Sequence, residues 1–276
     1  MASSVAAPAG VVVGHPKTRY TRVAALGLLM MAATPALFLV GGMLTGMDLG
    51  EVIAFMSGGI AVGLLGAGAI WRLGLLGRIL GVVTSLLLAG ALFWVAFGLG
   101  QPSSFLDFSG AAMFVVGFLM ALPGSIASLV AHPRGHVAVE ATNGEHRIMR
   151  GALVVVAAAM VVSGVLTLTA RGSVDAASAA GATPVVMQNF KFSPETYEGT
   201  AGENTKLLVH NSDAFMHNFA VPALGIKAVN IPPGSEAVFT VTGDAGMYAI
   251  YCTLHSSDST KDTPAEDDMA ALLTLK

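Results

Sequence analysis

Two kinds of hydrophobic pattern divide the chain. In the first part, apolar residues continue for about 20 positions at a time, which is the length an α-helix needs to cross a bilayer. Beyond residue 171, short apolar runs alternate with turn residues instead. The long runs contain no ionisable side chain, and they are Val23–Leu44, Val52–Trp71, Ile79–Leu99, Ala111–Ala131 and Gly151–Ala170. The pattern predicts a mixed membrane protein, with a five-helix transmembrane bundle (residues 23–170) followed by an all-β domain.

The charged residues between these runs predict an orientation in the membrane. Basic residues mark the cytoplasmic side of a membrane protein. They occur before the first run and in the second and fourth breaks: Lys17, Arg19, Arg22, Arg72, Arg78, Arg134, Arg147 and Arg150. In the first and third breaks, all charged residues are acidic: Asp48, Glu51 and Asp107. We therefore expect a cytoplasmic N-terminal segment (residues 1–22), five spans and an extracytoplasmic C-terminal domain in a multi-pass protein of the cell membrane.

The five apolar runs contain few side chains that could relay charge or bind a cofactor. They contain neither the ionisable residues that relay charge in pumps and transporters nor a histidine that could bind haem. Four methionines lie at similar depth near the outer ends of three runs, where thioethers could bind Cu(I) or fill gaps in the core: Met43, Met47, Met56 and Met113. Three histidines share the fourth break, as a metal site or as solvated loop residues: His132, His136 and His146.

Composition supports the division into two parts. Of 276 residues, 54% are hydrophobic and 11% are charged, against about 25% charged in soluble domains. This excludes an ordinary soluble domain, a disordered chain and a nucleic-acid binder. Residues 1–171 carry nine basic and five acidic side chains, whereas residues 172–276 carry five and twelve. The single cysteine excludes a disulfide framework and a C-x-x-C zinc site.

The second part reads as a linker and a small β domain. Small residues dominate the linker (residues 171–184), and the β domain covers residues 185–276. Six β-rich runs are separated by turn signals, which is typical of a sandwich or barrel: Val185–Phe192, Thr205–His210, Asn218–Val221, Ala237–Val241, Met247–Cys252 and Ala271–Leu275. A domain of this size without a disulfide has marginal stability, to which a bound metal could contribute.

Four side chains in this domain form a copper-binding set. Cys252 ends the run MYAIYC, and His255 follows three residues later. His217 lies upstream in HNF, and Met269 precedes the final β run. One thiolate, two imidazoles and a weak thioether are the ligands of blue-copper electron-transfer sites.

Residues 185–276 resemble the cupredoxins, the superfamily of plastocyanin and azurin, and in particular bacterial cupredoxin-like domains attached to membrane or lipid anchors. The resemblance is carried in order by NFKFSPE, AGENTKLLVHNSD, HNFAV, IPPGSEAVFTV, GMYAIYCTLH and the methionine before the last β run. It implies a Greek-key sandwich that binds one copper ion in a type 1 site. The implied ligands are His217, Cys252 and His255 in one plane, with Met269 as axial ligand.

The resemblance also implies supporting residues. Asn211 would form hydrogen bonds near the ligand loops, and three aromatic residues would surround the site: Phe215, Phe219 and Tyr251. The chain departs from the family in one respect, because thirteen residues separate His255 from Met269. The axial ligand therefore stays open between Met269 and a carboxylate of this insertion: Asp258, Asp262, Glu266, Asp267 or Asp268.

These observations favour a membrane-anchored one-electron carrier on the outer face of the membrane. The alternative is a copper storage, delivery or sensing protein in which methionines assist Cu(I) handling. A third possibility is a binding module whose metal site is vestigial, against which Cys252 and His255 argue. We expect no enzymatic activity, because the β domain lacks residues for a second copper site. The expected partners are the lipid bilayer and an unidentified redox protein, but not nucleic acid, and the oligomeric state is left open.

Overall fold

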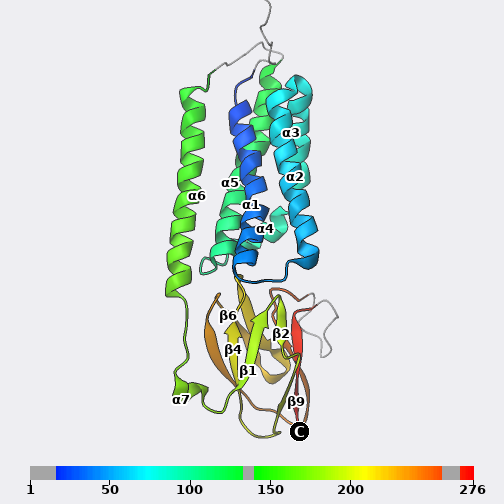
Figure 1. Cartoon of the computed structure of the whole chain (residues 1–276), viewed down its shortest axis with the longest axis vertical. Coiled ribbons are helices and arrows are strands. Elements are labelled where there is room, and N and C mark those ends of the chain that lie inside the picture. The colour runs from blue at the N-terminus through cyan, green and yellow to red at the C-terminus, as the bar shows by residue number, and fades with distance from the viewer. Residues whose placement is uncertain (1–16, 133–139, 257–267) are drawn as a thin grey trace, which may run out of the picture.

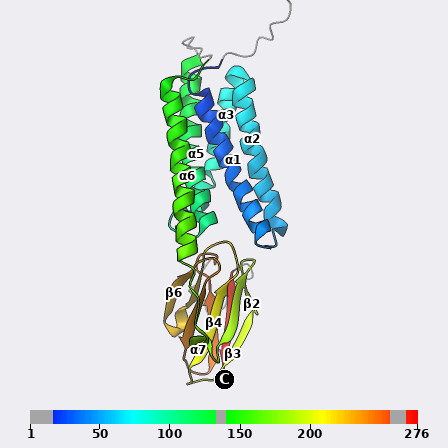
Figure 2. The ribbon, with the colours of Figure 1, turned by 60° about the vertical axis from the view of Figure 1, so that its left-hand side comes forward.

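The computed structural model describes residues 17–132, 140–256 and 268–276. It consists of a helical domain (residues 21–169) and a β domain (residues 183–275), drawn in Figure 1 and, turned by 60°, in Figure 2. Both views show the β domain at the lower end of the helical domain, with the long helices running nearly along the same axis.

The helical domain contains six helices in its described residues. They are α1 (Thr21–Leu44), α2 (Gly50–Arg72), α3 (Gly74–Ala89), α4 (Leu92–Gly98), α5 (Phe105–Ala131) and α6 (Asn143–Thr169). Four of them are long and apolar enough to cross a membrane, namely α1, α2 from Val52 on, α5 and α6. The remaining helices, α3 and α4, are shorter.

The third expected span is therefore wrong as a single helix. The run Ile79–Leu99 is divided between α3 and α4 by a turn at Gly90 and Ala91. The N–H groups of these two residues donate to carbonyls three positions back, at 3.4 and 3.0 Å, in place of the four-residue spacing of an α-helix. Glycine is among the weakest helix formers, so an unbroken apolar run does not ensure an unbroken helix.

Glycines allow the central helices to approach closely. A Cβ atom on Gly27 of α1 would lie 2.4 Å from the backbone nitrogen of Ala121 in α5, and one on Gly117 would lie 2.8 Å from the carbonyl oxygen of Gly27. In α2, a Cβ atom on Gly63 would lie 2.7 Å from that of Ala32. Small residues at helix contacts are the usual packing solution in membranes. Helix α1 is accordingly the centre of the domain.

The β domain is a sandwich of two sheets. One sheet has the order β2-β1-β4-β7 and the other β3-β9-β8-β5-β6. The strands are β1 (Thr183–Gln188), β2 (Lys191–Ser193), β3 (Thr196–Gly199), β4 (Thr205–Asn211), β5 (His217–Val221), β6 (Ile226–Ile231), β7 (Glu236–Val241), β8 (Gly246–Tyr251) and β9 (Ala270–Leu275). The pairs β1–β4 and β3–β9 are parallel, and the other pairs are antiparallel.

Three strands differ from the expected set. The run Val185–Phe192 forms two strands, because Asn189 and Phe190 make a two-residue turn with φ values of 55° and 56°. Strands β3 and β6 were not expected. Strand β3 has only four residues, too few for an alternating pattern to stand out in the sequence, and the four central residues of β6 are exposed, so β6 does not alternate.

The path of the linker determines which end of the sandwich faces the helical domain. After α6, the Gly172 carbonyl accepts from the N–H of Glu236 at 2.8 Å, beside the start of β7. The short helix α7 (Ala176–Ala179) lies near the far end of the β domain, and β1 starts there and runs back toward the helices (Figure 1). The turn between β1 and β2 is thereby placed next to the helical domain.

Candidate metal centre

Three of the four expected ligands converge on one point. The Nδ1 atoms of His217 and His255 lie 3.1 Å apart. The Sγ atom of Cys252 lies 3.7 Å from the first and 3.3 Å from the second. The sequence separates His217 from Cys252 by a long stretch of chain, so only the fold could bring them together.

Adjacent strands place His217 and Cys252. His217 is the first residue of β5 and Cys252 directly follows β8, and these two strands are paired. Asn218 joins the two ligand segments, because its side chain accepts from the N–H of Thr253 at 2.7 Å and donates to the Thr253 hydroxyl at 2.8 Å. The N–H of Asn218 also points to the Cys252 sulfur at 3.4 Å. The thiol is thus held by a hydrogen-bonded clamp.

Met269 lies next to the ligand loop despite the insertion. Its carbonyl accepts from the N–H of Cys252 at 2.9 Å, and its N–H donates to the carbonyl of His255 at 3.2 Å. The side chain is buried in the same hydrophobic cluster as Cys252. The insertion therefore starts and ends beside the site. Of its five acidic candidates for the axial position only Asp268 is described; Asp258, Asp262, Glu266 and Asp267 lie outside the described residues.

A buried carboxylate that the sequence did not single out orients His217. The Nε2 atom of His217 donates to Oδ2 of Asp213 at 2.7 Å, and neither side chain is exposed. Asp213 also accepts from the N–H groups of Asn189 and Phe190 at 2.8 and 3.0 Å. With its Nε2 protonated, the imidazole presents an unprotonated Nδ1 to a metal, as in the carboxylate–histidine–metal arrangement. The sequence signal was an acidic residue four positions before the histidine, which is common in loops.

Asn211 supports this loop. Its side-chain nitrogen donates to the carbonyls of Phe215 and Ile231 at 2.9 and 2.7 Å, and its oxygen accepts from the N–H of Asp213 at 3.0 Å. The asparagine thus holds the segment that carries Asp213 and leads into His217.

The aromatic residues around the site differ in part from those expected. Phe190 contacts both histidines, with ring centroids 5.5 Å from His217 and 4.9 Å from His255. Phe215 contacts Phe190 at 5.5 Å, so it lies behind the ring that contacts the histidines. Phe219 instead stacks on Phe239 in the sandwich core at 4.4 Å, and Tyr251 is buried in β8. Phe190 was missed because its position depends on the turn between β1 and β2.

The ligands are electrostatically coupled. Burial opposes ionisation of the Cys252 thiol, but hydrogen bonds to His217 and His255 and their charges lower its pKa to about 6. Burial likewise opposes protonation of His217, but hydrogen bonds to Asp213 and Cys252 and their charges raise its pKa to about 9. Burial also opposes ionisation of Asp213, yet the hydrogen bond from His217 and those from the β1–β2 turn keep the pKa of that carboxyl below its ordinary value. The site without metal therefore favours a thiolate and an imidazolium.

These side chains fit a metal ion. The candidate ligand atoms of His217, Cys252 and His255 all lie within 4.8 Å of one another. With bonds of about 2.0 Å to nitrogen and about 2.3 Å to sulfur, trigonal geometry separates the two nitrogens by about 3.5 Å and nitrogen from sulfur by about 3.7 Å. The separations in the structure, 3.1 Å between the nitrogens and 3.3 and 3.7 Å between nitrogen and sulfur, are equal to or somewhat shorter than these values. One thiolate and two imidazoles in a plane suit copper.

Comparison with known proteins agrees with the fold. Residues 153–261 match the family model of the Cupredoxin-like domain. The β domain is cupredoxin-like. The match begins inside α6 and ends before Met269 and β9, so its limits differ from those of the sandwich. No curated protein matches the chain.

Several solved structures are similar to part of the chain. A mutant of amicyanin in its Cu(I) form is 18% identical, covers 36% of this chain and 89% of its own, and has a TM-score of 0.27. Amicyanin from Paracoccus versutus is 17% identical, covers 35% of this chain and 83% of its own, and has a TM-score of 0.27. Dithionite-reduced auracyanin from Roseiflexus castenholzii is 16% identical, covers 35% of this chain and 99% of its own, and has a TM-score of 0.26.

Two of the other candidate methionines differ in burial, and one of the candidate histidines contacts an arginine. Met43 is 65% exposed, whereas Met113 is buried in a cluster with Met30 and Met120. The Nδ1 atom of His132 lies 3.0 Å from Arg78, and His136 lies outside the described residues.

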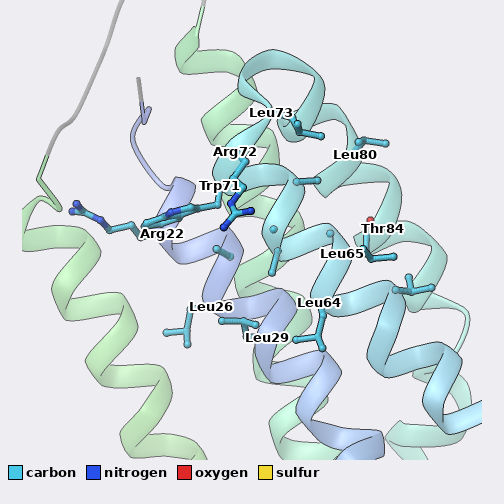
Figure 3. Close-up of a pocket in the computed structure, with 16 residues that line it drawn as sticks. Arg22, Leu26, Leu29, Leu64, Leu65, Trp71, Arg72, Leu73, Leu80 and Thr84 are labelled. Carbon is cyan, nitrogen blue, oxygen red and sulfur yellow. The ribbon is translucent and has the colours of Figure 1, made fainter. Parts of the chain in front are cut away.

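A groove between α1, α2 and α3 is shown in Figure 3. Its lining is largely apolar, with Arg22, Arg72 and Trp71 near the start of α1 and the end of α2. It lies toward the end of the helical domain away from the β domain (Figure 1). In a bilayer, such a surface would face lipid, so the groove adds nothing to the metal centre.

Proposed function

We propose that this protein is a membrane-anchored electron carrier that uses a single type 1 copper ion in its cupredoxin-like domain. The ligands would be His217, Cys252 and His255, with Met269 as the axial ligand. The convergence of one buried thiol and two imidazole Nδ1 atoms within 3.1 to 3.7 Å of one another carries this proposal. Copper bound there would supply a one-electron couple without protein-derived radicals.

The surrounding residues suit electron transfer. The Asn218 clamp holds Cys252 in place, and the N–H of Asn218 lies 3.4 Å from the sulfur, where it stabilises a thiolate. Asp213 fixes the ring of His217. His217 and Cys252 are fully buried, which excludes water from both ligands. Rigid, dry ligands keep the geometry similar in both oxidation states, so little reorganisation accompanies the transfer.

The arrangement of charged residues on the helices supports a position of the cupredoxin-like domain on the outer face of the membrane. Helices α2, α3 and α6 have basic residues near the end remote from the β domain, among them Arg72, Arg78 and Arg147, whereas Asp48 and Asp107 lie at the opposite end (Figure 1). By the distribution of positive charge, the first end is cytoplasmic. The cupredoxin-like domain would then be extracytoplasmic.

We also propose that the centre carries electrons and does not transform a substrate. His217 and Cys252 are enclosed by protein, and Met269 is buried beside them. With Met269 as the axial ligand, the coordination would leave no position for a substrate. A separate redox protein would exchange electrons with it, while lipid surrounds the helices.

The test is copper titration of the full chain in detergent, followed by visible absorption and electron paramagnetic resonance. We expect an intense thiolate-to-copper band and a narrow copper hyperfine splitting. Cys252→Ser should abolish the band while circular dichroism stays unchanged, and Thr253→Ser, in the same loop, should retain it. An intense band in Cys252→Ser would contradict the thiolate ligand. A weak band with wide splitting in the wild type would indicate a tetragonal site, as expected for copper storage or delivery.

A further inference from the structure

The metal-binding end of the cupredoxin-like domain rests on the helical domain. The N–H of Met216 donates to Oδ2 of Asp107 at 2.8 Å, and the N–H of Asp48 donates to the side chain of Asn189 at 2.8 Å. Figures 1 and 2 show the same end of the sandwich under the helices in both views. These contacts join the loops around the metal centre to the segments before α2 and at the start of α5.

Asp107 of the helical domain contacts the residue next to the proposed ligand His217. It lies in the first turn of α5, and its Oδ2 atom also accepts from the hydroxyl of Ser104 at 2.5 Å. Its other partner, Met216, immediately precedes His217 and is buried. The carboxylate therefore holds the backbone at the point where the chain enters the ligand strand β5.

A row of aromatic rings makes the same connection. Phe38 of α1 contacts Phe215 at 5.6 Å, Phe215 contacts Phe190 at 5.5 Å, and Phe190 contacts the ligand His255 at 4.9 Å. Gly110 of α5 makes room for the first ring, because a Cβ atom there would lie 2.6 Å from Phe38. The packing of α1 against α5 thus extends to the metal centre.

A carboxylate in this place has a predictable effect on a redox metal. Charge interactions are stronger in a partly buried site than in water. A negative charge stabilises the oxidised, more positive form of the metal more than the reduced form. Hydrogen-bonding partners behind the ligands also change metal affinity and potential.

We propose that Asp107 is a positioning residue of the metal centre. It holds the Met216–His217 segment and lowers the reduction potential of the bound copper, so that the helical domain is part of the redox centre as well as its anchor. The effect on the potential rests on the proposed function, whereas the contact with Met216 does not.

The experiment uses the full chain in nanodiscs and three variants. Asp107→Asn removes the charge but keeps an oxygen that can accept from Met216 and Ser104. Asp107→Leu removes both. The matched control is Asp48→Asn, because Asp48 lies at the same interface but contacts Asn189 through its backbone, while its carboxylate accepts from the N–H of Gly50.

Two readouts separate the contact from its redox consequence. The first is hydrogen exchange of the peptide containing Met216 in metal-free protein, where we expect at least about tenfold faster exchange in Asp107→Leu and no change in Asp107→Asn or the control. The second is the reduction potential of the copper-loaded protein. We expect both Asp107 variants to raise the ratio of Cu(I) to Cu(II) affinity about tenfold, which is about 59 mV for one electron.

The outcomes are distinct. Unchanged exchange in Asp107→Leu would overturn the contact and with it the proposal. Faster exchange with the same potential in wild type, both Asp107 variants and the control would overturn the redox role. If the wild type bound no copper, the proposed function would fail, whereas the exchange measurement would still decide whether Asp107 holds Met216.

Discussion

The imidazole of His217 donates from Nε2 to Oδ2 of Asp213 across 2.7 Å, with both side chains inaccessible to solvent. The same carboxylate accepts from the two N–H groups of the β1–β2 turn. Asp213 therefore connects a proposed ligand to the turn that carries Phe190, the ring that covers both histidines.

Asp213→Ala should weaken copper binding by about 10- to 100-fold, the usual cost of removing a carboxylate behind a metal-binding histidine. The reason is that His217 loses the partner that fixes its ring and its tautomer. The measurement is competition with a chelator of known affinity. Asp244→Ala, at an exposed position remote from the ligands, should bind copper like the wild type. Equal affinities for the two variants would show that Asp213 does not support the site.

Met269→Leu should raise the reduction potential and keep the intense visible band. Leucine preserves the backbone bonds to Cys252 and His255 and fills a similar volume, but it offers no electron pair to the metal. Spectroelectrochemistry of the full chain measures the change, with Met247→Leu as the control because Met247 is 70% exposed. If both variants matched the wild type, Met269 would not be a ligand, and a carboxylate of the insertion would become the candidate.

Copper affinity should depend on pH in two stages. A metal binds the thiolate and the unprotonated imidazole, so binding releases the protons that these groups carry. Between pH 6 and pH 9, His217 with its pKa of about 9 holds a proton while Cys252 with its pKa of about 6 does not, so affinity should rise with pH through the release of at least one proton.

Below about pH 6, the Cys252 thiol is protonated as well. One further proton is then released on binding, so affinity should fall more steeply as the pH decreases. Chelator competition across this range measures both slopes, and Cys252→Ser should lack the additional step. A single constant slope through pH 6 in the wild type would contradict the lowered pKa of the thiol.

Gly27→Ala should destabilise the helical domain, whereas Gly58→Ala should not. The new methyl group at Gly27 would lie 2.4 Å from the α5 backbone, but at Gly58 nothing lies within 4 Å. Overpacking of this kind costs about 1 to 3 kcal/mol, while alanine is a better helix former than glycine. Thermal unfolding in detergent compares the two variants. A melting temperature for Gly27→Ala equal to that of Gly58→Ala would argue against the close contact of α1 with α5.

The sequence pattern predicted the helical and β parts because each is indicated by the arrangement of hydrophobic and polar residues over short stretches of chain. The five apolar runs identified segments of all six helices of the helical domain, but they did not reveal the turn at Gly90 and Ala91 that separates α3 from α4. Hydropathy alone does not show whether a helix is continuous. Cys252 and His255 were found from their spacing, and His217 and Met269 from the order of residues along the chain.

What the sequence determined by itself was the chemistry available: one thiol, a few histidines and thioethers, and the hydrophobic runs that separate them. Only the tertiary structure decided which of these groups meet. Asp213, Phe190 and Asp107 reach the centre from a loop, a two-residue turn and a distant helix. Their positions follow from strand pairing and from contacts between the two domains. Both join residues that lie far apart in the sequence, so a pattern over neighbouring residues does not predict them.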